Sequence, residues 1–248
     1  MELNRTCSVL VSSCDAYSDL WKPFFSLFFA NWSDCPFEIY LGSNRATFSH
    51  ERVRMLFSDN DPVWSKSMGN YLSQLSTPYV LLVLEDFFFR RPVQTQNIVK
   101  ALEFLQRVDG QLLRLEPRPG PDRIVSDGFG ECLPGSPYRV STQASIWNRS
   151  ALQKLLVEGE SIWEFEIKGT SRASAYEKGF YASPVPLIGY GHHVVQRGKW
   201  FPWEARRFGN MNIGCDFSKR QVMGTKESAM WLAQKSKGLF WEFLRGVF

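Results

Sequence analysis

The sequence predicts an α/β protein whose central sheet is mostly parallel and flanked by helices. Short runs rich in Val, Leu and Ile at residues 7–12, 37–41 and 79–84 have the composition of buried strands. Segments with helical spacing of apolar residues separate these runs, and such alternation is typical of right-handed crossovers between parallel strands. Because 248 residues can bury a sizeable core, we expect residues 1–248 to form a single domain.

The elements of the first ninety residues are predicted in order. The strand over residues 7–12 ends in the polar stretch Ser-Ser-Cys-Asp. Ser18 is placed to cap a helix over residues 19–31, in which Pro23 is tolerated because it lies in the first turn. A strand, a helix and a further strand follow at residues 37–41, 65–74 and 79–84.

The later elements are less regular. A helix and a strand are expected at residues 98–108 and 111–115, and a strand at 138–147. Residues 117–137 are rich in proline and glycine, which predicts a long functional loop or lid. Asn148 caps a helix over residues 150–158, which Gly159 ends. A last amphipathic helix is expected over residues 227–248.

The composition narrows the class of ligand. The net charge of +4, without long runs of Lys or Arg, is too small a basic excess for nucleic-acid binding. It is compatible with an anionic small ligand or with an anionic membrane surface. Aromatic residues make up 15% of the chain, which suits core packing and stacking on ring-shaped ligands equally well.

The cysteines and the N-terminal residues predict a reducing environment. The five cysteines are scattered, without a C-x-x-C pair or a histidine at ligand spacing, so disulfides and structural zinc are not expected. The first residues lack a basic lead into an apolar core, and no stretch is long enough to cross a bilayer. We therefore expect a cytoplasmic protein.

Two adjacent acids follow the strand at residues 79–84. The stretch V-L-L-V-L-E-D-F-F-F-R places Glu85 and Asp86 where a buried strand ends, and ligands of open α/β sheets bind beyond such ends. Neighbouring residues of a strand point to opposite faces, so one acid should bind and the other be structural, unless the chain bends there. The alternative is a carboxylate that caps a helix or pairs with Arg90 or Arg91.

A second acidic motif, G-E-S-I-W-E-F-E-I-K-G-T, spans residues 159–170. Ser161 and Glu164 have the spacing of a capping box, which gives Glu164 a structural role if a helix begins here. Glu166 is then the freer carboxylate. The alternative interpretation makes Trp163 a core residue and Glu166 an ordinary surface acid.

The motifs L-E-D-F-F at residues 84–88 and W-E-F-E-I-K-G-T at 163–170 resemble those of glycosyltransferases with the GT-A fold. They are most similar to a bacterial group that is assigned to lipopolysaccharide or capsule synthesis. The resemblance covers about residues 7–200. It implies a Rossmann-like, nucleotide-binding half over residues 1–90, an acceptor-side half over 91–226, and sugar transfer from a nucleotide-sugar donor to a glycan or lipid-linked acceptor.

The resemblance also implies roles for the two acidic motifs. Asp86 with Glu85 would hold the donor or its divalent metal, Mn²⁺ or Mg²⁺. Phe88 stands where the family's Asp-x-Asp motif has its second carboxylate, so a metal would rest on Asp86 or Glu85 and on ligand oxygens. Glu166, with Glu164 as the second candidate, would take the proton from the acceptor hydroxyl in an inverting transfer. Trp163 would form a wall for a sugar ring.

Further residues are candidates for substrate contacts, each with a plainer alternative. Asp15 and Tyr17 lie where this fold meets the nucleotide, or in an ordinary turn. Cations that would neutralise the diphosphate in the absence of a metal are Lys66, Arg90 and Lys199. Other candidates are a pair that faces the acceptor sugar or is merely structural, Thr142 and Gln143, and a pair that ligates metal, touches phosphate or is part of a loop, His192 and His193.

Residues 230–248 mix bulky apolar side chains with Lys235, Lys237 and Arg245. Such a helix lies in a membrane interface, which would suit a lipid-linked acceptor at the inner face of the membrane, or it packs on the parent domain or on a partner.

Two other functions remain open from the sequence. A sugar nucleotidyltransferase shares the βαβ half, but it normally carries a Gly-rich, basic signature after the first strand, where this chain has S-S-C-D-A-Y-S-D. A glycan-binding module without catalysis would use the same aromatic residues, but it would need neither Glu166 nor affinity for nucleotides.

Overall fold

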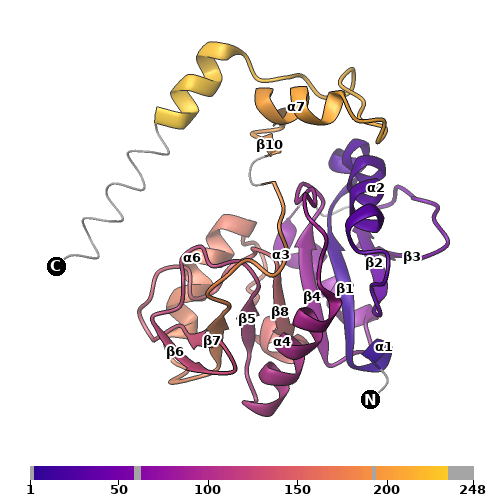
Figure 1. Ribbon diagram of the computed structural model, residues 1–248. Helices are drawn as coiled ribbons and strands as arrows, with labels where there is room; N and C mark the ends of the chain where they lie inside the picture. The colour runs from indigo at the N-terminus through magenta and orange to yellow at the C-terminus, as the bar shows by residue number, and fades with distance from the viewer. Residues whose placement is uncertain (1–2, 59–62, 192–193, 234–248) are drawn as a thin grey trace.

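The computed structural model describes residues 3–58, 63–191 and 194–233. Its central sheet is built from nine strands, β1 (Cys7–Ser12), β2 (Glu38–Ser43), β3 (Val53–Phe57), β4 (Tyr79–Leu84), β5 (Leu112–Arg114), β6 (Arg123–Ser126), β7 (Phe129–Glu131), β8 (Ser145–Asn148) and β9 (Phe180–Ala182). Their order is β3-β2-β1-β4-β8-β5-β9-β7-β6 (Figure 1). The first four strands in this order are mutually parallel, and β8 and β7 run against their neighbours. The predicted α/β class with a mostly parallel sheet is confirmed.

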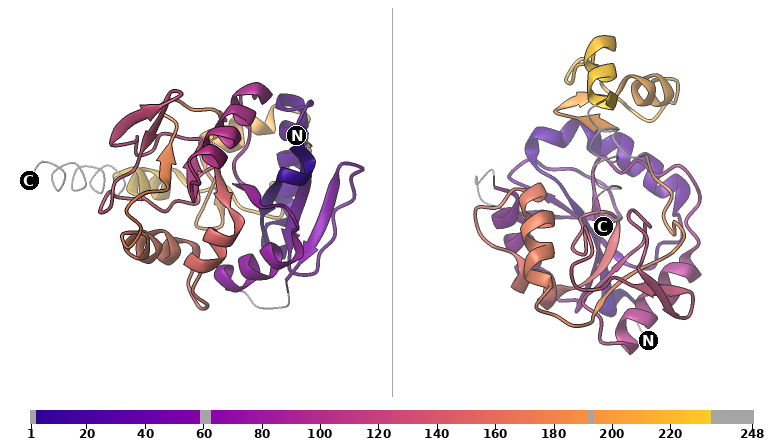
Figure 2. Two further views of the ribbon diagram at one scale, coloured as in Figure 1. Left: turned by 90° about the horizontal axis from the view of Figure 1, so that it is seen from below. Right: turned by 90° about the vertical axis from the view of Figure 1, so that its left-hand side faces the viewer.

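Helices cover both faces of the sheet (Figure 2). Those of the described residues are α1 (Leu3–Thr6), the 3-10 helix η1 (Asp15–Leu20), α2 (Trp21–Asn31), α3 (Trp64–Gln74), α4 (Thr95–Arg107), α5 (Arg149–Leu155), α6 (Ile162–Ala173) and α7 (Pro202–Gly209). Val9 and Val11 of β1 pack into one core cluster with α2 and α4, whereas Leu10 packs into a second with α3, α5 and α6. Both clusters follow from the alternation of side chains along a strand that is buried on both faces.

Several predicted elements differ from those observed. The strands at residues 7–12 and 79–84 have the predicted bounds, and the predicted cap of Asn148, which accepts a hydrogen bond from the amide of Ala151, is confirmed. Ser18 does not cap a helix, because it lies within η1 and α2 begins only at Trp21. Strands β3 and β9 were not predicted, and only the last part of the strand expected at residues 138–147 forms, as β8.

The predicted loop at residues 117–137 contains the hairpin β6–β7. Asp127 and Gly128 connect its strands, with φ of 53° and 80°. An Asp-Gly pair is the usual sequence signal for a two-residue hairpin turn, since both central residues need positive φ. This signal was present in the sequence.

A C-terminal segment, residues 194–233, lies across the carboxyl ends of the parallel strands (Figure 1). It contains the short hairpin of β10 (Val195–Gln196) and β11 (Lys199–Trp200), then α7, and it is helical again over residues 225–233. Phe88, fully buried after β4, packs against Trp200 and Phe208 of this segment, with ring centroids 5.8 and 4.9 Å away. No helix in the described part of the chain combines the length and apolar character needed to span a bilayer.

Candidate functional site

The candidate site lies where β1 and β4 end side by side. Ser12, the last residue of β1, pairs with Leu84, the last residue of β4. From β1 the chain proceeds outward through β2 and β3, and it then returns to place β4 on the other side of β1. This is a topological switch point, where the loops after two neighbouring strands separate and leave a crevice for ligands. The polar segment that begins at Ser13 and the acids Glu85 and Asp86 follow these two strand ends, and we call this switch point the crevice.

Glu85 and Asp86 lie in a turn rather than on the strand. The amide of Phe87 donates to the carbonyl of Leu84 over 3.0 Å, which closes the turn. The expectation that strand geometry separates the two acids therefore does not hold, because the chain bends at this point. Glu85 is buried and Asp86 is partly buried.

Both carboxylates are harder to ionise here than in water. Burial, and then the negative charge of Asp86, raise the pKa of Glu85 well above its usual value. Burial raises the pKa of Asp86 to about 6. Among the described residues neither carboxylate forms an ion pair, and the predicted alternative partner Arg90 is paired with Glu204 instead. The charge of Arg220 lowers the pKa of both acids, but burial outweighs it, so the fold offsets the cost of ionising them only in part.

The three phenylalanines after the acids anchor the turn in three directions. Phe87 stacks on Tyr190 with ring centroids 4.3 Å apart, and Phe89 packs against Phe24 and Phe28 of α2. Phe88 packs against Trp200 and Phe208 of the C-terminal segment. Aromatic packing on all sides fixes the backbone of the turn and thereby the position of both acids.

Arg220 of the C-terminal segment also lies at this site, and it was not among the residues predicted from the sequence. It donates to both carboxylate oxygens of Asp19 over 3.0 and 2.9 Å, and its guanidinium lies 4.5 Å from the ring centroid of Tyr17. Burial, and then the charge of Glu85, raise the pKa of Tyr17. Tyr17 thus lies at the same site as the two acids, as expected from its place after β1. No local pattern predicts Arg220, because its partner is 201 residues away.

Asp15 organises the loops after β1 and β2. Its carboxylate accepts hydrogen bonds from the Ser43 hydroxyl and from the backbone amides of Asn44, Arg45 and Ala46, at 2.7 to 3.2 Å. Partial burial opposes ionisation, but these hydrogen bonds outweigh it and lower the pKa of Asp15. The structure therefore shows Asp15 fixing the shape of the crevice through backbone donors.

Glu166 is connected to the same end of the sheet through the segment before β8. Its Oε1 accepts hydrogen bonds from the amide and hydroxyl of Thr142, at 2.7 and 2.9 Å, and from the Ser141 hydroxyl at 3.2 Å. β8 runs antiparallel to β4 with Leu82 opposite Ser145, so residues 141–144 precede β8 beside the end of β4. Within the described chain, Oε2 of Glu166 forms no hydrogen bond.

Gln143 in the same segment has a structural partner. Its side-chain oxygen accepts a hydrogen bond from the hydroxyl of Tyr190, which also accepts from the amide of Ala144. Since Tyr190 stacks on Phe87, this contact ties the segment before β8 to the turn that carries the acids.

Glu164 has a structural role at the start of α6. The capping box predicted from Ser161 and Glu164 is present, and Lys168 forms an ion pair with the Glu164 carboxylate at 2.9 Å. The hydrogen bond from the Ser161 amide, with the contact to Lys168, lowers the pKa of Glu164 to about 2. A carboxylate of such low basicity is a poor proton acceptor. Trp163 beside it is 72% exposed, so it is not a core residue.

The other predicted cations are engaged in ion pairs, and several predicted residues lie outside the described chain. Lys66, near the start of α3, lies 3.7 Å from the Glu158 carboxylate, and Lys199 of β11 forms an ion pair with Glu227 at 2.8 Å. His192, His193 and residues 234–248 of the predicted membrane helix lie outside the described residues. In the described part of the chain no group of three or more His, Cys, Asp and Glu side chains is arranged to hold a metal ion.

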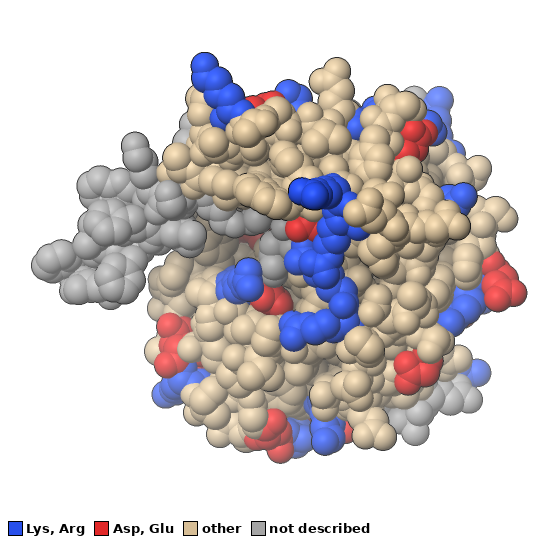
Figure 3. Space-filling view, turned by 45° about the horizontal axis from the view of Figure 1, so that its top comes forward, with Lys and Arg blue, Asp and Glu red and all other residues tan. Residues whose placement is uncertain are grey.

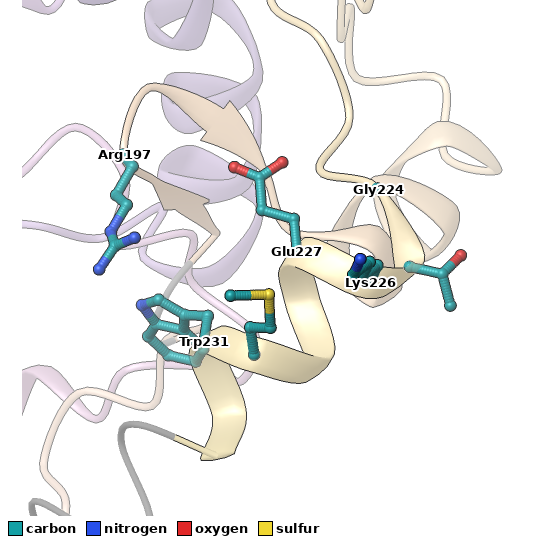
Figure 4. A pocket seen from close by; sticks show the side chains of 7 residues that line it. Arg197, Gly224, Lys226, Glu227 and Trp231 are labelled. Atoms are coloured by element: carbon teal, nitrogen blue, oxygen red, sulfur yellow. The ribbon is translucent and has the colours of Figure 1, made fainter.

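One hollow of about 430 Å³ lies within the C-terminal segment (Figure 4). Arg197 of the β10–β11 hairpin and Glu227 and Trp231 of the last described helix line it. None of the residues predicted for the site is among its lining residues, so it does not belong to the crevice at β1 and β4.

Comparisons with known proteins identify the fold. No protein-family model and no curated protein matches the chain. One similar solved structure is the mannosyltransferase PcManGT from Pyrobaculum calidifontis in complex with GDP-Man and Mn²⁺, with a TM-score of 0.50 and 11% identity over 81% of this chain and 60% of that chain. A mycobacterial protein has a TM-score of 0.50 and 14% identity over 90% of this chain and 78% of that chain.

Staphylococcus aureus TarS, residues 1–349, is similar with a TM-score of 0.48 and 15% identity over 72% of this chain. This chain spans 60% of that TarS fragment and 37% of a longer TarS chain. With the sheet order described above, the similarity to the mannosyltransferase shows that the chain has a GT-A-like, Rossmann-like α/β fold.

Proposed function

We propose that the protein is a glycosyltransferase that moves a sugar from a nucleotide-sugar donor to a glycan or lipid-linked glycan acceptor in surface polysaccharide synthesis. The observation that carries the proposal is the pair of acids, Glu85 and Asp86, at the switch point of a GT-A-like sheet without an ion-pair partner in the described chain. Buried carboxylates with raised pKa values and no structural partner are typical of functional sites. A lipid-linked acceptor would place the protein at the inner face of the membrane.

The two acids fit a divalent cation. The charge of Asp86 makes Glu85 harder to ionise, so a cation held by the two carboxylates would reduce this repulsion. Mg²⁺ and Mn²⁺ prefer oxygen donors, which this pair provides. Asp86 with Glu85 would hold such an ion, which would neutralise the diphosphate of the departing nucleotide. Tyr17, half-buried beside the acids, would contact the nucleotide, and Asp15 would hold the loop on which it lies.

Glu166 is our proposed general base. Its Oε1 is committed to Thr142 and Ser141, which orients the carboxylate, and the other oxygen forms no hydrogen bond among the described residues. Oε2 would take the proton from the acceptor hydroxyl as that hydroxyl attacks the anomeric carbon, which inverts the configuration. The exposed ring of Trp163, three residues earlier on α6, would support the acceptor sugar, with Gln143 close by.

Thermal-shift measurements against a panel of nucleotide sugars, with Mn²⁺ or with EDTA, test this function. We expect one nucleotide sugar to raise the Tm in Mn²⁺ and to do so less in EDTA. A glycan-binding module would respond to glycans but to no nucleotide, and a nucleotidyltransferase would release pyrophosphate from a nucleoside triphosphate and a sugar phosphate. Either result would contradict the proposal.

A further inference from the structure

A second groove, separate from the crevice at β1 and β4, carries an unusual density of arginine. It has a volume of about 480 Å³, and its charged lining residues are Arg90, Arg91, Arg118, Arg207, Glu116 and Glu204. Figure 3 shows a continuous column of Lys and Arg side chains across the face of the molecule that includes the C-terminal segment. The four lining arginines come from the segments that follow β4 and β5 and from α7, so the fold gathers them from distant parts of the sequence. We call this the arginine groove.

The arginine groove retains positive charge after its internal ion pairs are formed. Glu204 pairs with Arg90 at 2.5 Å, and Glu116 pairs with Arg118 at 3.0 Å. Arg91 and Arg207 form no ion pair within the described chain, so four arginines face two glutamates. Guanidinium groups grouped in a concave surface favour planar oxyanions such as phosphate and carboxylate, which they bind through paired hydrogen bonds.

Two buried polar atoms of the groove have no hydrogen-bond partner. They are Nε of Arg90, a donor, and Oε2 of Glu204, an acceptor. An unpaired buried polar atom is costly, so such atoms commonly mark a place that a ligand or water completes. An oxyanion would satisfy the donor and a hydroxyl would satisfy the acceptor, which together describe a phosphorylated sugar or polyol.

The backbone at residues 189–191 is shaped to accept the arginines. The amide of Arg90 donates to the carbonyl of Gly189, and the amide of Gly191 donates to the carbonyl of Phe88. A Cβ on Gly189 would lie 2.6 Å from Nε of Arg91, and one on Gly191 would lie 2.6 Å from a terminal nitrogen of Arg90. The glycines therefore let both guanidinium groups lie directly on the backbone, where longer side chains would displace them.

Tyr190 lies between the arginine groove and the turn that carries Glu85 and Asp86. It lines the groove, and it stacks on Phe87 directly after the acids. Burial, and then the charges of Glu116 in the groove and Asp86 in the crevice, raise the pKa of Tyr190. Tyr190 is therefore close to charged groups of both the groove and the turn, so the groove lies next to the two acids.

We propose that the arginine groove binds a phosphoryl group of the acceptor substrate, with Arg90, Arg91 and Arg207 as its partners and Glu204 accepting from a neighbouring hydroxyl. The inference deepens the proposed function and rests on it. The phosphoryl group belongs either to a soluble phosphorylated glycan or to the diphosphate of a lipid-linked one, and the chemistry of recognition is the same in both.

The test measures ligand binding by the double variant Arg91→Gln/Arg207→Gln, with Arg206→Gln as the matched control. Arg206 is exposed on α7 next to Arg207 but does not line the groove. All titrations are made in EDTA, so that a metal-held diphosphate site does not contribute. One arm uses glucose 6-phosphate against glucose, and the other uses vesicles that contain a polyprenyl-diphosphate sugar against vesicles of neutral lipid.

We expect the wild type and Arg206→Gln to bind one of the two phosphorylated probes, and the double variant to bind it about tenfold more weakly or worse, at unchanged Tm. The arm that responds identifies the source of the phosphoryl group. Equal affinity in the double variant, or no binding by the wild type in either arm, would overturn the proposal. Binding of nucleotide sugars in Mn²⁺ is followed in parallel. If the wild type binds no nucleotide sugar but does bind the phosphorylated probe, the proposed function is refuted, while phosphoryl binding by the groove stands without its role in an acceptor site.

Discussion

The acids after β4 and the acids on α6 are both parts of motifs, yet the fold treats them in opposite ways. Glu85 and Asp86 lie in a turn that packed aromatic rings anchor, and they have raised pKa values without an ion-pair partner in the described chain. Glu164 and Glu166 accept hydrogen bonds from nearby amides and hydroxyls. The α6 acids therefore contribute to folding, whereas the β4 acids oppose it, and a charge that opposes folding requires an explanation in binding.

The largest difference is expected for Asp86→Asn. The variant removes a charge that repels Glu85, so its Tm should equal or exceed that of the wild type, while sugar transfer should be abolished because the donor diphosphate is no longer held. Activity assays and calorimetric unfolding on the same preparation check both parts. A variant that transfers sugar normally, or that unfolds at a clearly lower temperature, would mean that Asp86 is structural.

Glu166 is expected both to accept a proton in the reaction and to stabilise the fold, and two substitutions separate these roles. Glu166→Gln keeps Oε1 as an acceptor for Thr142 and should lower kcat by about 10²–10⁴-fold with little loss of stability. Glu166→Ala should also leave the Thr142 amide without a partner and lower the free energy of unfolding by about 1–3 kcal/mol. The measurements are kcat and urea unfolding; full activity of Glu166→Gln would remove Glu166 from the reaction.

The pH dependence of stability should reflect the raised pKa values of the acids after β4. Because the folded-state pKa of Asp86, about 6, exceeds its unfolded value, the folded form binds more protons, and this contribution to stability falls as pH rises from about 4 to 6. The decline should be smaller in the double variant Glu85→Gln/Asp86→Asn. The free energies of unfolding of the wild type and of the double variant, measured at pH 4 to 7, give this difference in slope. Parallel curves would show that the fold does not destabilise the ionised acids.

The smallest effect is expected for Glu164→Ala. Loss of the capping box should lower the Tm slightly, since Glu164 is exposed and only the first turn of α6 loses its cap. Donor binding and kcat should not change. A fall in kcat with unchanged donor affinity would instead place Glu164, rather than Glu166, in the proton transfer.

The sequence supported predictions where structure is local. β1 and β4 are continuous apolar runs, and the capping box of α6 follows from the spacing of Ser161 and Glu164, so both could be identified without coordinates. The short strand β9 depends on pairing with β5 and β7 and has no periodic pattern of its own. Likewise, the irregular segment before β8 is held by hydrogen bonds that the amide and hydroxyl of Thr142 donate to the Glu166 carboxylate, which no propensity reveals.

The candidate site shows the same limit. The place of Glu85 and Asp86 at the end of a strand could be predicted, but the turn that brings both acids to one crevice could not, because it depends on Phe87, Phe88 and Phe89 packing against three different elements. Arg220 and the arginine groove arise only when the C-terminal segment folds over the sheet.

The measurement that tests the central claim most directly is calorimetric titration with the nucleoside diphosphate of whichever nucleotide sugar raises the Tm in the thermal-shift panel. It is made in Mn²⁺ and in EDTA, with the wild type, Asp86→Asn and, as the control, Glu164→Ala. We predict metal-dependent binding by the wild type and Glu164→Ala, and affinity about tenfold lower or worse in Asp86→Asn. Equal affinities of all three proteins in Mn²⁺ would contradict the assignment of the β4 acids to the donor.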